Sequence, residues 1–196
     1  MHSALRPHTA LVTAAPRHVG GADLTLRARD AAIVHLEGPR EDRVLAPSLK
    51  ALSIPTLPPI GRCTGTADAR MLGIGPDIWL LVRDEGSAES TANFLDTARS
   101  SFEVALDMSA AWTRMIISGA HAATVLAKGC GVDLHPREFP AGTCAATAVA
   151  RMRTIIWRPE GGARYELVVG RSYALSLWDW LVEAAAEYAD IKEERP

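Results

Sequence analysis

The feature that most constrains the fold of this chain is a plan of elements that occurs twice. One apolar run ends at Gly38 and a similar run ends at Gly119, 81 residues later. A second run begins at Trp79 and has its counterpart at Tyr165, 86 residues later. Each half therefore predicts a strand, a helix, a hairpin and a helix, in pseudo-repeats at about residues 22–104 and 105–196. Two such units can pair their sheets and bury one face of each, so we expect one α+β domain over residues 1–196.

The first half is predicted from its apolar spacing and its turn residues. After an irregular arm of about 20 residues, we expect a strand at 30–36 and a helix at 40–52. Gly75, Pro76 and Asp77 then separate two runs, 66–74 and 78–83, which predicts a hairpin. A helix reaching about residue 101 follows, with Ser87 or Ser90 as its N-terminal cap.

The second half follows the same order. A strand at 113–118 enters Gly119, and a helix at 120–128 ends at Gly129. Strands are expected at 143–157 and 164–169, with Gly161 and Gly162 in the turn between them. Ser172 is expected to cap a last helix that runs to about residue 190.

The last helix carries an unusually wide aromatic arc. Trp178 and Trp180 flank its apolar stripe on opposite sides, each roughly 80° from the centre at about 100° per residue. One interpretation is that both indoles border the core. The other is that at least one faces a partner, because tryptophan is enriched in interface hot spots, so Trp178 and Trp180 are the predicted partner interface.

Composition excludes several classes of protein. Apolar residues make up 48% and charged residues 22%, which describes an ordinary folded chain. The formal charge is −2 and there is no block of Lys and Arg, so we expect no nucleic-acid partner. No apolar run approaches the roughly 18 residues of a membrane span. Three cysteines are too few and odd in number for a disulfide framework, which predicts a cytoplasmic protein.

Candidate chemistry is sparse. The nearest approach to a metal cluster is formed by Cys130, Asp133, His135 and Cys144. These residues lack the two short ligand pairs that are typical of zinc sites. The alternative is a loop with structural cysteines. His121 at a helix start could meet an anion, or could be a solvated residue beside the cap. The motifs of dinucleotide sites, phosphate loops and nucleophile elbows are absent. The sequence therefore predicts no catalytic, cofactor-binding or metal-binding residue.

Five segments, in order along the chain, resemble the gamma subunit family of heterotetrameric sarcosine oxidase. They are LGIGPDIWLL at 72–81, DMS at 107–109, ISG at 117–119 with Ala122, Val125 and Leu126, GCGVDL at 129–134 leading to FPAG at 139–142, and RSYA at 171–174 with Leu177, Trp178, Trp180 and Leu181. The resemblance extends over about 120 residues and is loose in the first 65.

This resemblance implies a role and a fold. Members of the family assemble with a large alpha subunit, a flavin-bearing beta subunit and a small zinc-binding delta subunit. The complex demethylates sarcosine oxidatively to glycine, with FAD, FMN and NAD on the alpha and beta subunits and tetrahydrofolate accepting the one-carbon unit. The gamma subunit looks like the duplicated α+β folate-binding fold of aminomethyltransferases. The resemblance thus implies a non-catalytic structural subunit that binds no cofactor itself, in which Gly119 closes a turn, Ser172 caps a helix and Trp79 anchors the hairpin.

Two alternatives remain beside that interpretation. A stand-alone tetrahydrofolate-binding, aminomethyltransferase-like protein would need the acidic residue that such enzymes carry in an Asn-rich segment. Asp77 lies in the comparable hairpin without that Asn, and is predicted to be a turn residue instead. A free-standing iron–sulfur or redox helper would depend on Cys130 or Cys144.

Overall fold

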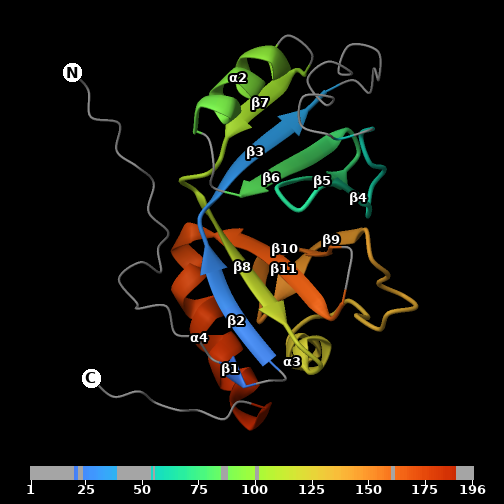
Figure 1. Ribbon diagram of the computed structural model, residues 1–196, viewed down its shortest axis with the longest axis vertical. Helices are drawn as coiled ribbons and strands as arrows, with labels where there is room; N and C mark the ends of the chain where they lie inside the picture. Colours follow the sequence, from blue (N-terminus) through green and yellow to red (C-terminus); the bar gives the residue numbers. More distant parts are fainter. Residues whose placement is uncertain are drawn as a thin grey trace, which may run out of the picture.

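Two antiparallel sheets lie face to face, with helices on their outer sides (Figure 1). The computed structural model describes residues 20–21, 24–38, 54, 56–84, 88–99, 102–159 and 162–188. The five-stranded sheet has the order β4 (Cys63–Gly65), β5 (Ala69–Gly75), β6 (Ile78–Asp84), β3 (Ala31–Glu37), β7 (Val104–Asp107). The six-stranded sheet has the order β9 (Thr143–Val149), β10 (Met152–Arg158), β11 (Arg164–Gly170), β8 (Trp112–Ser118), β2 (Leu24–Arg29), β1 (Gly20–Gly21).

The chain passes between the two sheets at two crossings. It leaves the six-stranded sheet after β2 and enters the five-stranded sheet as β3. After β7 it returns as β8 to the six-stranded sheet, where β8 lies between β2 and β11. The early strand β2 therefore belongs to the sheet of the second half, and β7 pairs with β3 of the first half. Figure 1 shows both crossings near the middle of the molecule.

Helices cover the outer face of each sheet. On the five-stranded sheet, α2 (Ala88–Ala98) buries Phe94, Leu95 and Ala98 in one hydrophobic cluster with strand residues such as Trp79. On the six-stranded sheet, α3 (Ala122–Ala127) and α4 (Ala174–Ala185) cover the strands with fully buried side chains, namely Val125, Leu126, Leu177 and Leu181. Each such side chain contributes about 1.5–3 kcal/mol through burial, which fixes these helices to the sheet.

A third hydrophobic cluster fills the space between the sheets. Ile33, Leu72 and Leu80 from one sheet meet Ile155, Trp157 and Val168 from the other. The central strands are apolar on both faces because one face meets a helix and the other meets the opposite sheet. The sheets also join at one edge, where the Cys63 N–H donates to Gly142 O (2.8 Å) and the Cys144 N–H donates to Gly61 O (2.9 Å).

Most predicted elements are confirmed, with shifts at their ends. The strand expected at 30–36 is β3, the hairpin is β5 and β6, and the strand at 113–118 is β8. Gly119 lies in the strand-to-helix turn at φ +119°, and its carbonyl oxygen accepts a hydrogen bond from the Ala122 N–H at the start of α3 (3.0 Å). The helix expected at 120–128 is α3, and α2 ends at Ala98 rather than near residue 101.

The prediction of one strand at 143–157 was wrong. Residues 143–149 and 152–158 form the separate strands β9 and β10, which pair with each other around a two-residue turn. Ala150 and Arg151 occupy this turn at φ +49° and +66°. Such turns usually carry Gly, Asn or Asp, which tolerate positive φ, so the sequence holds no local signal for it. Strands β1, β2, β4 and β7 were also not predicted, and β1 lies at the end of the arm that was expected to be irregular.

Of the predicted helix caps, Ser172 and Ser90 do not occupy cap positions. A 3₁₀ turn, Arg171–Tyr173, precedes α4, and Tyr173 occupies the N-cap position without a side-chain hydrogen bond, so Ser172 does not cap the helix. Ser90 lies inside α2 rather than at its start. After α4 a 3₁₀ turn covers Ala186–Tyr188. The helix expected at 40–52, the arm at 1–19, Ser87 and residue 190 lie outside the described residues.

Among the described residues, none of the helices has the length and apolar character needed to cross a membrane.

Candidate functional site

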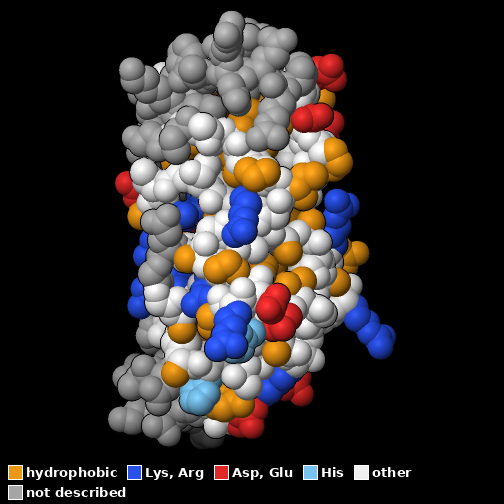
Figure 2. All heavy atoms as spheres, turned by 90° about the vertical axis from the view of Figure 1, so that its right-hand side faces the viewer, with side chains coloured by type: hydrophobic (Ala, Val, Ile, Leu, Met, Phe, Trp, Pro, Cys, Tyr) orange, Lys and Arg blue, Asp and Glu red, His pale blue; other side chains and the backbone are white. Residues whose placement is uncertain are grey.

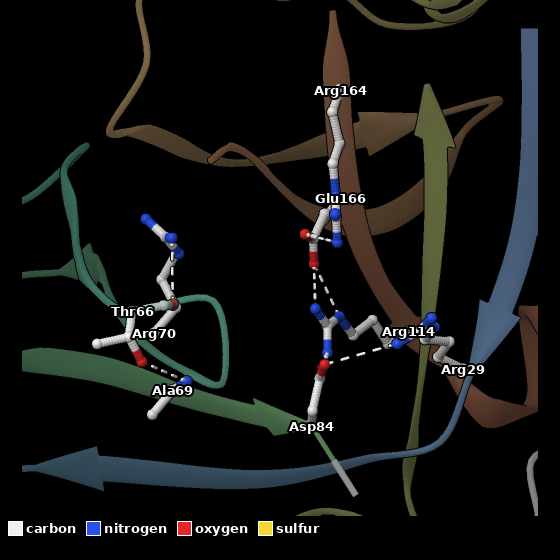
Figure 3. A network of polar contacts seen from close by, with 8 residues as sticks. All are labelled: Arg29, Thr66, Ala69, Arg70, Asp84, Arg114, Arg164 and Glu166. Carbon is white, nitrogen blue, oxygen red and sulfur yellow. Dashed lines mark hydrogen bonds and ion pairs between the residues drawn. The ribbon is translucent and has the colours of Figure 1, made fainter. Parts of the chain in front are cut away.

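The most developed polar arrangement is an ionic network between the two sheets (Figure 3). Arg114 on β8 is 4% exposed and contacts Glu166 on β11 through Nε (2.8 Å) and Nη2 (2.6 Å). Its Nη1 pairs with Asp84, which ends β6 in the opposite sheet. Arg164 adds a contact of 2.6 Å to Glu166, and Arg29 lies 3.6 Å from Asp84. The network thus ties the two sheets together through charge-assisted hydrogen bonds.

The register of the strands explains why Arg114 and Glu166 meet. Arg114 is the ladder partner of Val168, and Glu166 is the ladder partner of Ile116. The two charged residues are therefore diagonal neighbours on the face that looks toward the other sheet, within reach of a long side chain. Each charge is almost fully buried, and each is matched by an opposite charge, as buried charges must be.

A small pocket of about 130 Å³ opens beside this network. The polar residues that line the pocket are Arg70, Arg114, Arg164 and Glu166. Its apolar lining residues are Ala67, Val82, Trp157 and Pro159. In Figure 3, Arg70 lies on the opposite side of the view from Glu166 and Arg164, and all three line the pocket. The pocket is formed by both sheets, since Arg70 lies on β5 and Glu166 lies on β11.

Positive charge does not gather into one basic field on the face in Figure 2. There Lys and Arg side chains are separated by hydrophobic and uncharged ones. A phosphate backbone requires a continuous basic track. This face therefore offers no such track.

Cys144 and Cys63 lie at the edge where the sheets join. The Cys144 thiol donates to Arg62 O (3.2 Å) and to Gly73 O (3.4 Å). Burial raises the pKa of Cys144 to about 12, and the nearby Cys63 adds to this effect. Since the thiolate is the reactive and metal-binding form, Cys144 is an inert thiol at neutral pH. This chemistry disfavours a redox role for Cys144.

The residues considered for a metal site are not brought together. Cys130 belongs to the cluster under α3 and α4, whereas Cys144 lies between the sheets. Asp133 accepts a hydrogen bond from the His135 N–H (2.8 Å), and His135 Nδ1 accepts one from the Arg137 N–H (3.3 Å). These bonds order a loop. Within the described parts of the chain, no three His, Cys, Asp or Glu side chains form a group that could hold a metal.

His121 packs against an aromatic ring at the other end of the molecule. Its imidazole stacks on Tyr188 with ring centroids 4.2 Å apart, and Lys128 lies 5.2 Å above the same ring. Lys128 also pairs with Glu187, and this hydrogen bond holds the pKa of Glu187 below its usual value. The arrangement links α3 to the end of α4, and it occupies one face of the His121 ring.

Asp77 and Trp79 have local roles in the hairpin. Asp77 adopts φ +50° in the turn between β5 and β6. Trp79 is 3% exposed, donates from Nε1 to Pro58 O (2.9 Å), and meets the Phe102 ring edge-on at 5.9 Å. These contacts agree with the prediction of a turn residue and of a hairpin anchor.

The two tryptophans of α4 differ in exposure. Trp178 is 4% exposed and belongs to the core under α4, so it has almost no surface for a partner. Trp180 is half-buried. Its ring covers Gly129, where an added Cβ would lie 2.5 Å from Trp180 Cζ2. Of the two, Trp180 alone keeps surface for contact, and its interface role stays a prediction.

Sequence reasoning missed the ionic network. Its signal is a charged residue inside a mainly apolar strand, as with Arg114 in 112–118 and Glu166 in 164–170. Charged side chains are rarely fully buried unless they are paired, so such positions point to a partner elsewhere in the chain. The partner itself could not be named from one sequence.

Comparison with known proteins gives a consistent result. The family model described as "Sarcosine oxidase, gamma subunit family" matches residues 45–187. The chain is 32% identical to sarcosine oxidase subunit gamma of Corynebacterium sp. (strain U-96) over 133 residues, covering 66% of this chain and 60% of that protein. It is 33% identical to the corresponding subunit of Corynebacterium sp. (strain P-1), covering 66% of this chain and 61% of that protein. The alignments therefore span less than two thirds of these relatives.

Solved structures show the same relationship. A chain of the heterotetrameric sarcosine oxidase from Corynebacterium sp. U-96 superposes with a TM-score of 0.77 and 27% identity, covering 94% of this chain and 97% of that chain. An aminomethyltransferase of the glycine cleavage system from Bartonella henselae superposes with a TM-score of 0.60 and 18% identity, covering 84% and 46%. The second likeness concerns the fold alone. The family model and these likenesses together show that the chain belongs to the sarcosine oxidase gamma subunit family.

Proposed function

We propose that this chain is the non-catalytic, structural gamma subunit of a heterotetrameric sarcosine oxidase. Its partners would be an alpha, a beta and a delta subunit, which together demethylate sarcosine to glycine in the cytoplasm. FAD, FMN and NAD would be held by the partners, and tetrahydrofolate would accept the one-carbon unit there. The gamma subunit would contribute a rigid surface on which the partners assemble.

One observation carries this proposal. The superposition with a chain of a heterotetrameric sarcosine oxidase extends over 94% of this chain and 97% of that chain. A shared fold alone would not indicate a role, but this likeness comes with 27% sequence identity and with a match of residues 45–187 to the gamma subunit family. The geometry of the polar groups is consistent with a structural role, because Arg114, Glu166 and Asp84 are engaged with one another between the sheets.

Mild affinity purification of the chain from its native host tests the proposal. We expect a yellow complex with three further subunits, flavin absorbance and sarcosine-dependent peroxide formation. Recovery of a colourless single chain would contradict it, and a tetrahydrofolate titration of that chain would then test the alternative.

The alternative is a stand-alone tetrahydrofolate-binding protein similar to aminomethyltransferases. The observation in its favour is the shared fold, with a TM-score of 0.60. However, the matched region is 46% of the aminomethyltransferase, and Asp77 is part of a tight turn here. This alternative predicts saturable binding of tetrahydrofolate to the isolated chain.

We also infer that the single domain of residues 1–196 arose from the two pseudo-repeats, 22–104 and 105–196. The order of the strands supports this. Across each sheet the spatial order is an edge strand (β4 or β9), two antiparallel strands joined by a turn (β5–β6 or β10–β11), a long strand (β3 or β8), and then a strand contributed by the other pseudo-repeat (β7 or β2). In this description, β2 and β7 are equivalent strands that the two units exchange.

Glycines at equivalent positions support the same inference. Gly38 and Gly119 both follow a strand at positive φ, +138° and +119°. Gly61 and Gly142 adopt φ +78° and +79°, and each accepts a hydrogen bond from the cysteine region of the other half. Both pairs are 81 residues apart. Only glycine adopts such angles freely, so the pairs reflect one backbone path used twice.

A further inference from the structure

We propose that the pocket beside the ionic network is a docking site for a carboxylate, supplied by an Asp or Glu side chain of a partner subunit. This inference rests on the proposed function, because it assumes that the chain assembles with other proteins. It assigns the contact to Arg70, Arg164 and the pocket between them.

The arginines of the pocket are not fully used by the chain itself. Arg70 donates from Nη2 to Thr66 O (3.1 Å), and it has no carboxylate partner among the described residues. Arg164 pairs with Glu166 through Nη2, while its buried Nε has no hydrogen-bond partner in the described part of the protein. A guanidinium has five N–H donors, so both arginines keep donors for a further acceptor.

The charge of the region favours an anion. The network and the pocket together contain two carboxylates, Asp84 and Glu166, and four arginines, Arg29, Arg70, Arg114 and Arg164. The network and the pocket therefore carry a net charge of +2. Both carboxylates are already engaged in ion pairs with arginines other than Arg70. A carboxylate bound in the pocket would reduce this net positive charge from +2 to +1.

The walls and the size of the pocket restrict the occupant. Trp157 and Val82 are 1% and 2% exposed and form a dry wall, where a charge-assisted hydrogen bond is stronger than in water. The volume of about 130 Å³ lies below the roughly 300–1,000 Å³ of small-molecule and cofactor sites. It suits the end of one side chain, and a planar carboxylate matches the fork of an arginine.

The proposal is tested in the assembled complex, with the chain co-expressed with the other subunits of its host. We expect Arg70→Gln to weaken assembly by at least about 30-fold in Kd, the loss typical when one partner of a buried interfacial charge pair is removed. Arg70→Lys, which keeps the charge without the planar fork, should fall between Arg70→Gln and the wild type. Arg99→Gln is the matched control, since Arg99 is exposed and pairs only with Asp96 among the described residues. Far-UV circular dichroism checks that each variant is folded.

A second measurement does not depend on affinity. A photo-crosslinking residue at Ala67, an exposed lining position, should join the chain to a partner peptide that contains Asp or Glu. Equal assembly of Arg70→Gln, Arg99→Gln and the wild type, without such a crosslink, would overturn this proposal while leaving the proposed function intact. If, in that case, sodium acetate stabilised the isolated wild-type chain, the pocket would be a binding site for free carboxylates. That result would overturn the proposed contact with a partner side chain. Failure of the wild type to assemble would overturn both proposals.

Discussion

Replacement of Arg114 by Met tests whether the ionic network holds the two sheets together. Methionine keeps much of the apolar stem but removes the guanidinium, which leaves the 4% exposed Glu166 with Arg164 as its remaining partner. Asp84 would keep Arg29 at 3.6 Å. Removing one partner of a buried ion pair costs about 3–5 kcal/mol. We expect about 3 kcal/mol, because both carboxylates keep one arginine, and a fall in Tm of about 6–12 °C at roughly 2–4 °C per kcal/mol.

Urea unfolding followed by tryptophan fluorescence measures this loss, with the m-value as a check that the unfolded state is unchanged. The double variant Arg114→Met/Glu166→Leu should be more stable than Arg114→Met, since no buried carboxylate is then left poorly paired. Arg99→Met removes an exposed pair and should cost less than about 1 kcal/mol. If Arg114→Met lost no more than Arg99→Met, the network would not be a stabilising connection between the sheets.

Three further predictions concern other parts of the molecule. Gly129→Ala should lower the free energy of unfolding by about 1–3 kcal/mol, because the new Cβ would lie 2.5 Å from the Trp180 ring. In urea unfolding, the double variant Gly129→Ala/Trp180→Leu should recover part of this loss. Cys144, with its pKa raised to about 12, should resist thiol reagents at pH 8 until the protein unfolds, and rapid modification of the native chain would contradict its burial. The hydrogen bond from Lys128 lowers the pKa of Glu187 from its usual value of 4.5. The pair should therefore stabilise the folded chain above about pH 4.5, and this stabilisation should be lost as the pH falls. Lys128→Met should flatten this part of a Tm profile measured from pH 3 to 6.

The elements that could be predicted from the sequence are those whose signal is local. Apolar runs bounded by Gly and Pro predicted β3, β8 and the β5–β6 hairpin, because side-chain burial and turn geometry depend on neighbouring residues. Strand β2 carried a signal that was overlooked: Leu24, Leu26 and Ala28 alternate with polar residues, as in a half-buried strand. Strand β7 has four residues and is too short for any periodic pattern.

The candidate site could be predicted only in part, because its geometry is not local. Arg114 and Glu166 are 52 residues apart, and Arg114 and Asp84 are 30 apart. Each is visible as a charge in or beside an apolar strand, yet their meeting depends on the register of β8 with β11 and on the way the sheets face each other. Arg70 reaches the same pocket from the opposite sheet. A single sequence contains no measure of that arrangement.

Three structural connections hold the sheets in one relative position, and this bears on the proposed role. The crossings after β2 and β7 place a strand of each half in the other half's sheet. The edge near Cys63 and Cys144 joins the sheets by backbone hydrogen bonds, and the Arg114 network joins them by charge. A subunit that contributes a surface to an assembly must present it in a fixed shape, since any ordering left to the moment of binding reduces affinity. The pocket is formed by residues of both sheets, so its shape depends on these connections, and loosening any one of them should weaken partner binding even where no contacting residue has changed.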